Sequence, residues 1–201
     1  MIDTNVPKGI LVPGMPQTLL CPEKNEGWQR VRDAYDKARD EIEKTDAEII
    51  VIYSTFWPSI LGHQIQAFPE PEWTHVDDEF HDLGSISYKF RMDSEFAELA
   101  VAKCKERGLH ARTVSYFGFP IDTGSVVALK LLNPDNRLPA VIVSSNMYAN
   151  RAETIVLGKS VRDAIDSSGK KAAVVVVSAL SNRLHTTPIE PVDDKIHSLK
   201  D

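Results

Sequence analysis

The densest group of potential metal ligands in this sequence lies in one short stretch. It contains two histidines and three acidic residues: His75, Asp77, Asp78, Glu79 and His81. All of these side chains can bind a divalent metal, so a self-sufficient metalloenzyme that uses the His75–His81 loop is one hypothesis. Their spacing matches neither two histidines on one helix face nor a metal knuckle. Because charge runs usually lie in solvent, a solvated acidic loop is the favoured interpretation.

Two further motifs carry weaker chemical signals. Gly158-Lys159-Ser160 is similar to the end of a phosphate-binding loop, but Glu153 stands where that pattern requires a glycine, and the segment is predicted to be helical. Nucleotide binding is therefore not expected. His63 lies too far along the chain from Phe56 to replace a ligand at that position, so we expect a surface or interface histidine.

Composition limits the classes of partner. The chain has 201 residues, a formal net charge of -6 and a pI near 5.5. A net negative surface argues against nucleic acid and anionic membranes as partners, and no apolar run approaches the roughly 20 residues of a membrane span. The first residues lack the basic start and apolar core of a secretory signal, and Cys21 and Cys104 lack metal or redox spacing. We expect a cytoplasmic protein with reduced thiols.

The hydrophobic periodicity alternates between strand and helix, which predicts an α/β fold with one domain over residues 1–201. We expect a central mostly parallel or mixed sheet flanked by helices. Predicted helices cover Glu26–Lys44, Asp93 or Ser94 to Gly108, and about Arg151–Ser167. Predicted strands cover Gly9–Val12, Glu48–Tyr53, Leu109–Tyr116, Val126–Leu132, Ala140–Ser144 and Ala172–Val177. The segment Trp57–Arg91 has no clear periodicity, and a connection of that length usually covers a site or an interface.

An aromatic pair follows the buried strand Glu48–Tyr53. Ser54-Thr55-Phe56-Trp57 falls at the carboxyl end of that strand, where ligands bind in open α/β sheets. This context resembles the class III extradiol ring-cleaving dioxygenases, which have a protocatechuate 4,5-dioxygenase-like fold and a Ser-x-His-Trp element. In that family the histidine binds metal, and here Phe56 takes its place.

Three other positions extend the resemblance. A strand followed by Pro13-Gly14-Met15-Pro16 is similar to the family's His-x-Pro element, with Gly14 at the second imidazole position. Asp122-Thr123-Gly124 resembles an Asp-His-Gly element, and Leu180-Ser181-Asn182 a Leu-Ser-His element. The resemblance implies a vestigial pocket at Gly14, Phe56, Thr123 and Asn182. Thr123 and Asn182 can form hydrogen bonds, but they cannot serve as acid–base groups near neutral pH.

The resemblance implies a degenerate subunit. Oxygen-activating iron needs two imidazoles and one carboxylate on one face, and neither Gly14 nor Phe56 supplies a donor atom. In the family the carboxylate lies downstream of the late strand, so we expect a domain without the family's C-terminal segment. We therefore expect no catalytic or metal-binding residue and no cofactor in this chain, with Fe(II) in a partner.

The Pro-Gly-Met-Pro opening points to one branch of the family. It resembles the non-catalytic α subunits of hetero-oligomeric members that act on 2-aminophenol. In these members a homologous β subunit holds the iron, and an α2β2 assembly is the natural expectation. A stand-alone binding or scaffold protein that kept the fold remains the second alternative.

Overall fold

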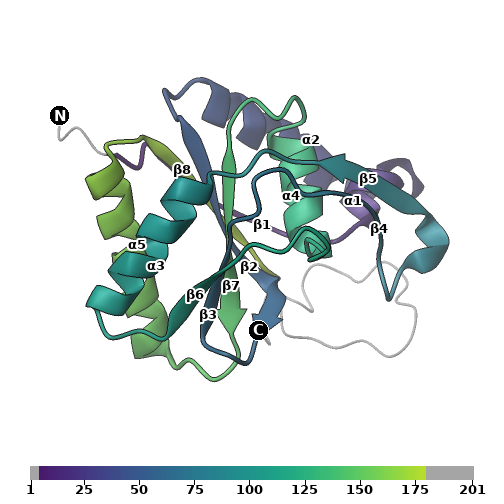
Figure 1. The fold of residues 1–201 in the computed structure, drawn as a ribbon. Coiled ribbons are helices and arrows are strands. Elements are labelled where there is room, and N and C mark those ends of the chain that lie inside the picture. Colours follow the sequence, from purple (N-terminus) through teal and green to yellow (C-terminus); the bar gives the residue numbers. More distant parts are fainter. Residues whose placement is uncertain (1–4, 180–201) are drawn as a thin grey trace.

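A twisted six-stranded sheet forms the centre of the computed structural model, which describes residues 5–179 (Figure 1). The strands lie in the order β1-β8-β2-β7-β3-β6. The first four are parallel to one another, β3 is antiparallel to β7, and β6 is parallel to β3. The expected α/β class with a mixed sheet is therefore confirmed.

The element bounds follow the chain in order. The strands are β1 Lys8–Val12, β2 Ile49–Ser59, β3 His63–Gln66, β4 Glu72–Val76, β5 Ser85–Lys89, β6 Ala111–Val114, β7 Ala140–Asn146 and β8 Ala172–Val177. The α-helices are α1 Gln17–Leu20, α2 Glu26–Glu43, α3 Ser94–Glu106, α4 Thr123–Leu132 and α5 Arg151–Ser168. Short 3-10 turns cover Pro22–Lys24 and His81–Leu83.

Helices cover both faces of the sheet, α3 and α5 on one side and α2 and α4 on the other (Figure 1). Strand β2 alternates between them: Ile50 and Ile52 join the core under α2 and α4, whereas Ile49 and Val51 join the core under α3 and α5. Such an uninterrupted apolar run suits a strand that is buried on both faces. No helix among residues 5–179 is long and apolar enough to cross a membrane.

Two expectations about secondary structure are wrong. Val126–Leu132 lies in helix α4 and is not a strand, because Asp122 caps a helix by accepting from the backbone N–H of Ser125. A short apolar run that is buried on all sides carries no periodicity to separate helix from strand. The segment Trp57–Arg91 is also more regular than expected, since it contains β3 and the antiparallel hairpin β4–β5.

Candidate functional site

The ring of Phe56 lies at the carboxyl edge of the sheet, wedged between two glycines. A Cβ atom built on Gly14 would come within 2.7 Å of Phe56 Cε2 and within 2.7 Å of the Gly124 Cα. A Cβ atom on Gly124 would come within 2.6 Å of Phe56 Cδ2, and Val177 lies within 2.9 Å of both built atoms. We call this cluster of Gly14, Phe56, Gly124 and Val177 the Phe56 site. The ring fits only because positions 14 and 124 carry no side chain.

Local structure positions each part of the site. Strand β2 continues past the predicted end to Ser59, and its register against β7 shifts between Ser54 and Pro58. Such irregularities re-aim side chains near functional edges, and this one contains Phe56. The hydroxyl of Tyr35 donates to the carbonyl oxygen of Pro13 and so holds the chain just ahead of Gly14.

Residues of the Phe56 site do not fit a bound metal ion. Gly14 has no side chain, Phe56 and Val177 offer no donor atom, and the phenyl ring fills the space between the first two strand ends and α4. Among residues 5–179, no group of three or more His, Cys, Asp and Glu side chains could hold a metal. Of the four predicted pocket positions, the fold brings Gly14, Phe56 and Thr123 to one edge. Asn182 lies outside the described residues.

The His75–His81 loop divides into two parts. Thr123 Oγ1 donates to Asp77 Oδ2 at 2.5 Å, and His75 Nε2 lies 2.6 Å from the same hydroxyl. Because the threonine proton goes to the carboxylate, the hydroxyl oxygen is free to accept from the imidazole N–H. Asp78, Glu79 and His81 are exposed, as expected for a solvated loop. No sequence pattern indicates the link from His75 to Thr123, because the two residues are distant in the chain.

A buried carboxylate lies behind the Phe56 site. Asp122 Oδ1 accepts from the Ser54 hydroxyl at 2.8 Å and from the Ser125 backbone N–H at 2.9 Å. Oδ2 is buried and has no hydrogen-bond partner among residues 5–179. Burial disfavours the charged form and raises the pKa of Asp122, although both hydrogen bonds oppose the shift. Asp122 thus fixes strand β2 to the start of α4, which is a structural role.

His63 is buried, so the prediction of a surface or interface histidine is wrong. Only 1% of the residue is exposed. Its Nε2 lies 3.3 Å from Glu153 Oε1 on α5, a contact that lacks hydrogen-bond geometry, and Nδ1 finds no hydrogen-bond partner in the described part of the chain. Burial lowers the pKa of His63, while the nearby Glu153 carboxylate raises it less strongly. The apolar turn before β3 folds this histidine inward, which its sequence spacing does not reveal.

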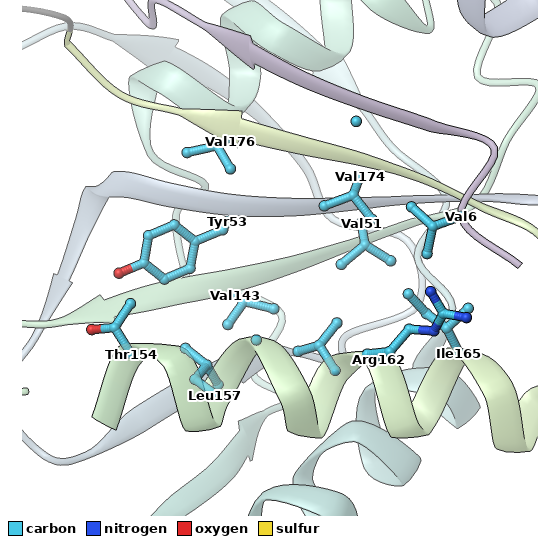
Figure 2. A pocket seen from close by; sticks show the side chains of 13 residues that line it. Val6, Val51, Tyr53, Val143, Thr154, Leu157, Arg162, Ile165, Val174 and Val176 are labelled. Carbon is cyan, nitrogen blue, oxygen red and sulfur yellow. The ribbon is translucent and has the colours of Figure 1, made fainter. Parts of the chain in front are cut away.

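Two cavities differ in chemical character. One, of about 550 Å³, adjoins the Phe56 site and is lined by Trp57, Trp73, His75, Phe119 and Asp122 among others. The other, of about 580 Å³, lies between α5 and the strands β1, β8, β2 and β7 (Figure 2). Valine, leucine and isoleucine side chains line most of this second cavity. Arg162, the one charged side chain that lines it within residues 5–179, is engaged by Asp166. The first cavity is therefore the one lined by ionisable and hydrogen-bonding side chains, such as His75 and Asp122.

Gly158-Lys159-Ser160 lies inside helix α5, as predicted. The backbone N–H groups of a helix interior are already bonded, so they cannot cradle a phosphate. Ser160 Oγ donates to the carbonyl oxygen of Val156 at 2.9 Å. This motif belongs to the helix and not to a nucleotide site.

The chain belongs to a family of ring-opening dioxygenases. Residues 10–191 match the family model described as the catalytic LigB subunit of aromatic ring-opening dioxygenase. The chain is 32% identical over 187 residues to the 2-aminophenol 1,6-dioxygenase alpha subunit of a Pseudomonas species, a match that covers 92% of this chain and 69% of the relative. Membership of the family, expected from the Phe56 and Gly14 contexts, is thereby confirmed.

Other relatives widen the comparison. The 2-aminophenol 1,6-dioxygenase beta subunit of a Pseudomonas species is 28% identical over 208 residues, covering 96% of this chain and 68% of that protein. The 3,4-dihydroxyphenylacetate 2,3-dioxygenase of Escherichia coli is 23% identical over 175 residues, covering 86% and 63%. The crystal structure of the uncharacterized protein JW3007 from Escherichia coli K12 superposes with a TM-score of 0.53 at 16% identity, which supports the fold alone. The alignment covers 73% of this chain and about half, 52%, of that structure.

Proposed function

We propose that this chain is a non-catalytic α-type subunit that supports a homologous, iron-bearing β subunit in a ring-cleaving dioxygenase. The observation that carries the proposal is the Phe56 ring, which fills the space between Gly14 and Gly124 where the family would place imidazole ligands. Without those donors this chain cannot build the two-histidine, one-carboxylate face that oxygen-activating iron requires. Its contribution is then to stabilise and shape the partner.

The relatives suggest the substrate and the assembly. Both a 2-aminophenol 1,6-dioxygenase alpha subunit and the beta subunit of that activity are similar to this chain. We infer that the complex opens the ring of 2-aminophenol with oxygen and Fe(II) bound in the partner, within aromatic-compound catabolism. An α2β2 heterotetramer is the assembly we expect, because homologous subunits pair through similar faces. Two buried free cysteines, Cys21 and Cys104, agree with a cytoplasmic location.

The test compares the isolated chain with the complex. The chain is purified alone and together with the homologous β subunit from the same source, each is loaded anaerobically with Fe(II), and bound iron and oxygen uptake with 2-aminophenol are measured. We expect bound iron and turnover in the complex and neither in the isolated chain. Stoichiometric iron and turnover in the isolated chain would overturn the proposal.

Each of the two alternatives has a test of its own. A metalloenzyme based on the His75–His81 loop should lose its metal when His75 and His81 are replaced by alanine. The engagement of His75 and Asp77 by Thr123 argues against that alternative. A stand-alone scaffold would be recovered from its native host as a monomer without an iron-containing companion.

A further inference from the structure

Two neighbouring loops at the carboxyl edge carry four exposed large apolar side chains. Ile60 and Leu61 form the β2–β3 turn and are 60% and 52% exposed, and Met147 and Tyr148 in the β7–α5 loop are 66% and 79% exposed. We call these four residues the loop patch. Both loops lie at the lower end of the sheet in Figure 1, and strand register places Ser59 beside Asn146. Single exposed apolar residues are ordinary, whereas an adjacent group of this kind marks an interaction surface.

Hydrogen bonds hold the two loops in place. The Met147 backbone N–H donates to the Ser59 carbonyl oxygen at 2.9 Å, and the Ser59 hydroxyl donates to the Gly62 carbonyl oxygen at 2.7 Å. The Tyr148 backbone N–H donates to Asn146 Oδ1 at 3.1 Å. Loops that are already fixed lose little conformational entropy when a partner binds. The loop patch is therefore preorganised: its two loops are held in place before the partner binds.

Charged groups around the loop patch favour an acidic partner surface. Arg112 and Arg151 are both exposed, and an Arg112 Nη2 donates to the Leu61 carbonyl oxygen at 3.3 Å. Arg151 is the first residue of α5, where the helix dipole disfavours a cation, so it does not stabilise the helix. Glu153 in the same turn lies beside His63. Met and Tyr in an apolar centre, with Arg beside them, are residue types enriched in protein–protein interfaces, which have an apolar core and a polar rim.

We propose that the loop patch is the surface on which the iron-bearing β subunit docks, with acidic side chains of that subunit facing Arg112 and Arg151. This inference rests on the proposed function and specifies its interface. The beta-subunit relative aligns with 96% of this chain, so a homologous partner has loops at the same edge of its own sheet. Pairing of the two edges around a pseudo-twofold axis places the corresponding loops of the two subunits against each other, while their side chains can differ.

The experiment measures the dissociation constant of the full chain with the β subunit. Leu61→Asp places a charge in the centre of the loop patch, and Leu11→Asp is the matched control because Leu11 on β1 is 51% exposed. We expect Leu61→Asp to weaken binding at least about tenfold, as for an interface hot spot, and Leu11→Asp to change it less than about twofold. Tyr148→Ser provides a second variant if Leu61→Asp lowers the melting temperature. Arg151→Glu should slow association and flatten its salt dependence.

Failure of the inference differs from failure of the proposed function. Unmodified chain that does not associate with the β subunit overturns both. Association that is undiminished by Leu61→Asp and Tyr148→Ser, with both variants folded, overturns the docking surface and leaves the function standing. An equal loss with Leu11→Asp also overturns it.

Discussion

The phenyl ring at position 56 fits because the neighbouring residues, Gly14 and Gly124, have no side chains. Gly14 and Gly124 do not adopt left-handed backbone angles, so their conformations alone would permit other residues. Their requirement for glycine comes from close approach, since an added methyl group would meet the ring, Val177 and, for Gly14, the backbone of α4. In the Phe56 site, the phenyl ring therefore packs directly against the backbone of the two glycines.

Replacing Gly124 with alanine should destabilise the protein. The added Cβ would lie 2.6 Å from Phe56 Cδ2 and 2.9 Å from Val177 Cγ1, so we expect a loss of about 1–3 kcal/mol in the free energy of unfolding, measured in urea. Gly158→Ala is the control, because nothing lies within 4 Å of that position in α5 and alanine should gain up to about 1 kcal/mol.

The same substitution should be partly rescued by a smaller side chain at position 56. In Gly124→Ala/Phe56→Leu, the clash with the ring is relieved, so the two changes should cost less together than the sum of each alone. We expect a coupling free energy of about 1 kcal/mol or more in a double-mutant cycle. Strict additivity would show that ring and glycine do not share one space.

Phe56 and Gly14 could be singled out from the sequence because each follows an apolar strand in a context that resembles a histidine element of the family. It did not identify Gly124 as their partner, because a close approach of backbone to a ring leaves no periodic pattern. The burial of His63 was missed for a related reason, since the turn that folds it inward is set by tertiary contacts.

The hairpin β4–β5 is attached to the start of α4 through side chains. Thr123, the first residue of α4, bonds Asp77 and His75, and Asp122 bonds Ser54 on β2. Strand β4 is mostly exposed, so these contacts matter for its order. Hairpin, helix and central strand thus meet at one point beside the Phe56 site.

Thr123→Val tests this attachment. Valine keeps the shape of threonine but removes the hydroxyl that serves both partners, so protection of the β4–β5 amides in hydrogen exchange should fall. We expect the free energy of unfolding to fall by about 1–2 kcal/mol. The loss stays in this range because His75 and Asp77 are half-buried, so water can replace the missing hydroxyl as their partner. Thr74→Val, which removes only an exposed contact with Ser87, is the control and should leave exchange near Thr123 unchanged.

The βαβ layout of the whole molecule could be predicted, since long amphipathic helices and apolar strands carry strong periodic signals. Helices α2, α3 and α5 and strands β1, β7 and β8 lie where the sequence indicated. Helix α4 was mistaken for a strand because the core surrounds it on all sides. The small hairpin was missed because its strands are short and polar, so only pairing defines them.

His63 should make the stability of the whole fold depend on pH. Its pKa in the folded protein lies below the ordinary value of 6.5, so the unfolded chain binds more protons between the two values. The free energy of unfolding should therefore fall as the pH drops below about 6.5. In His63→Leu this part of the fall should disappear, as measured by urea unfolding at about pH 5 and about pH 7.5. Asp122 is unchanged in that variant, so its own titration cancels in the comparison.

The filled edge of the sheet also limits which single substitutions could place donor atoms there. A histidine introduced at position 14 would have its Cβ 2.7 Å from the Gly124 Cα, whatever residue occupies position 56. A histidine introduced at position 56 alone would have no second imidazole opposite it, because position 14 is a glycine. Neither substitution alone therefore supplies two imidazole donors, and the first requires the start of α4 to move. A pair of donors at this edge would need both positions to change together with a shift of the helix, so no single substitution can build it.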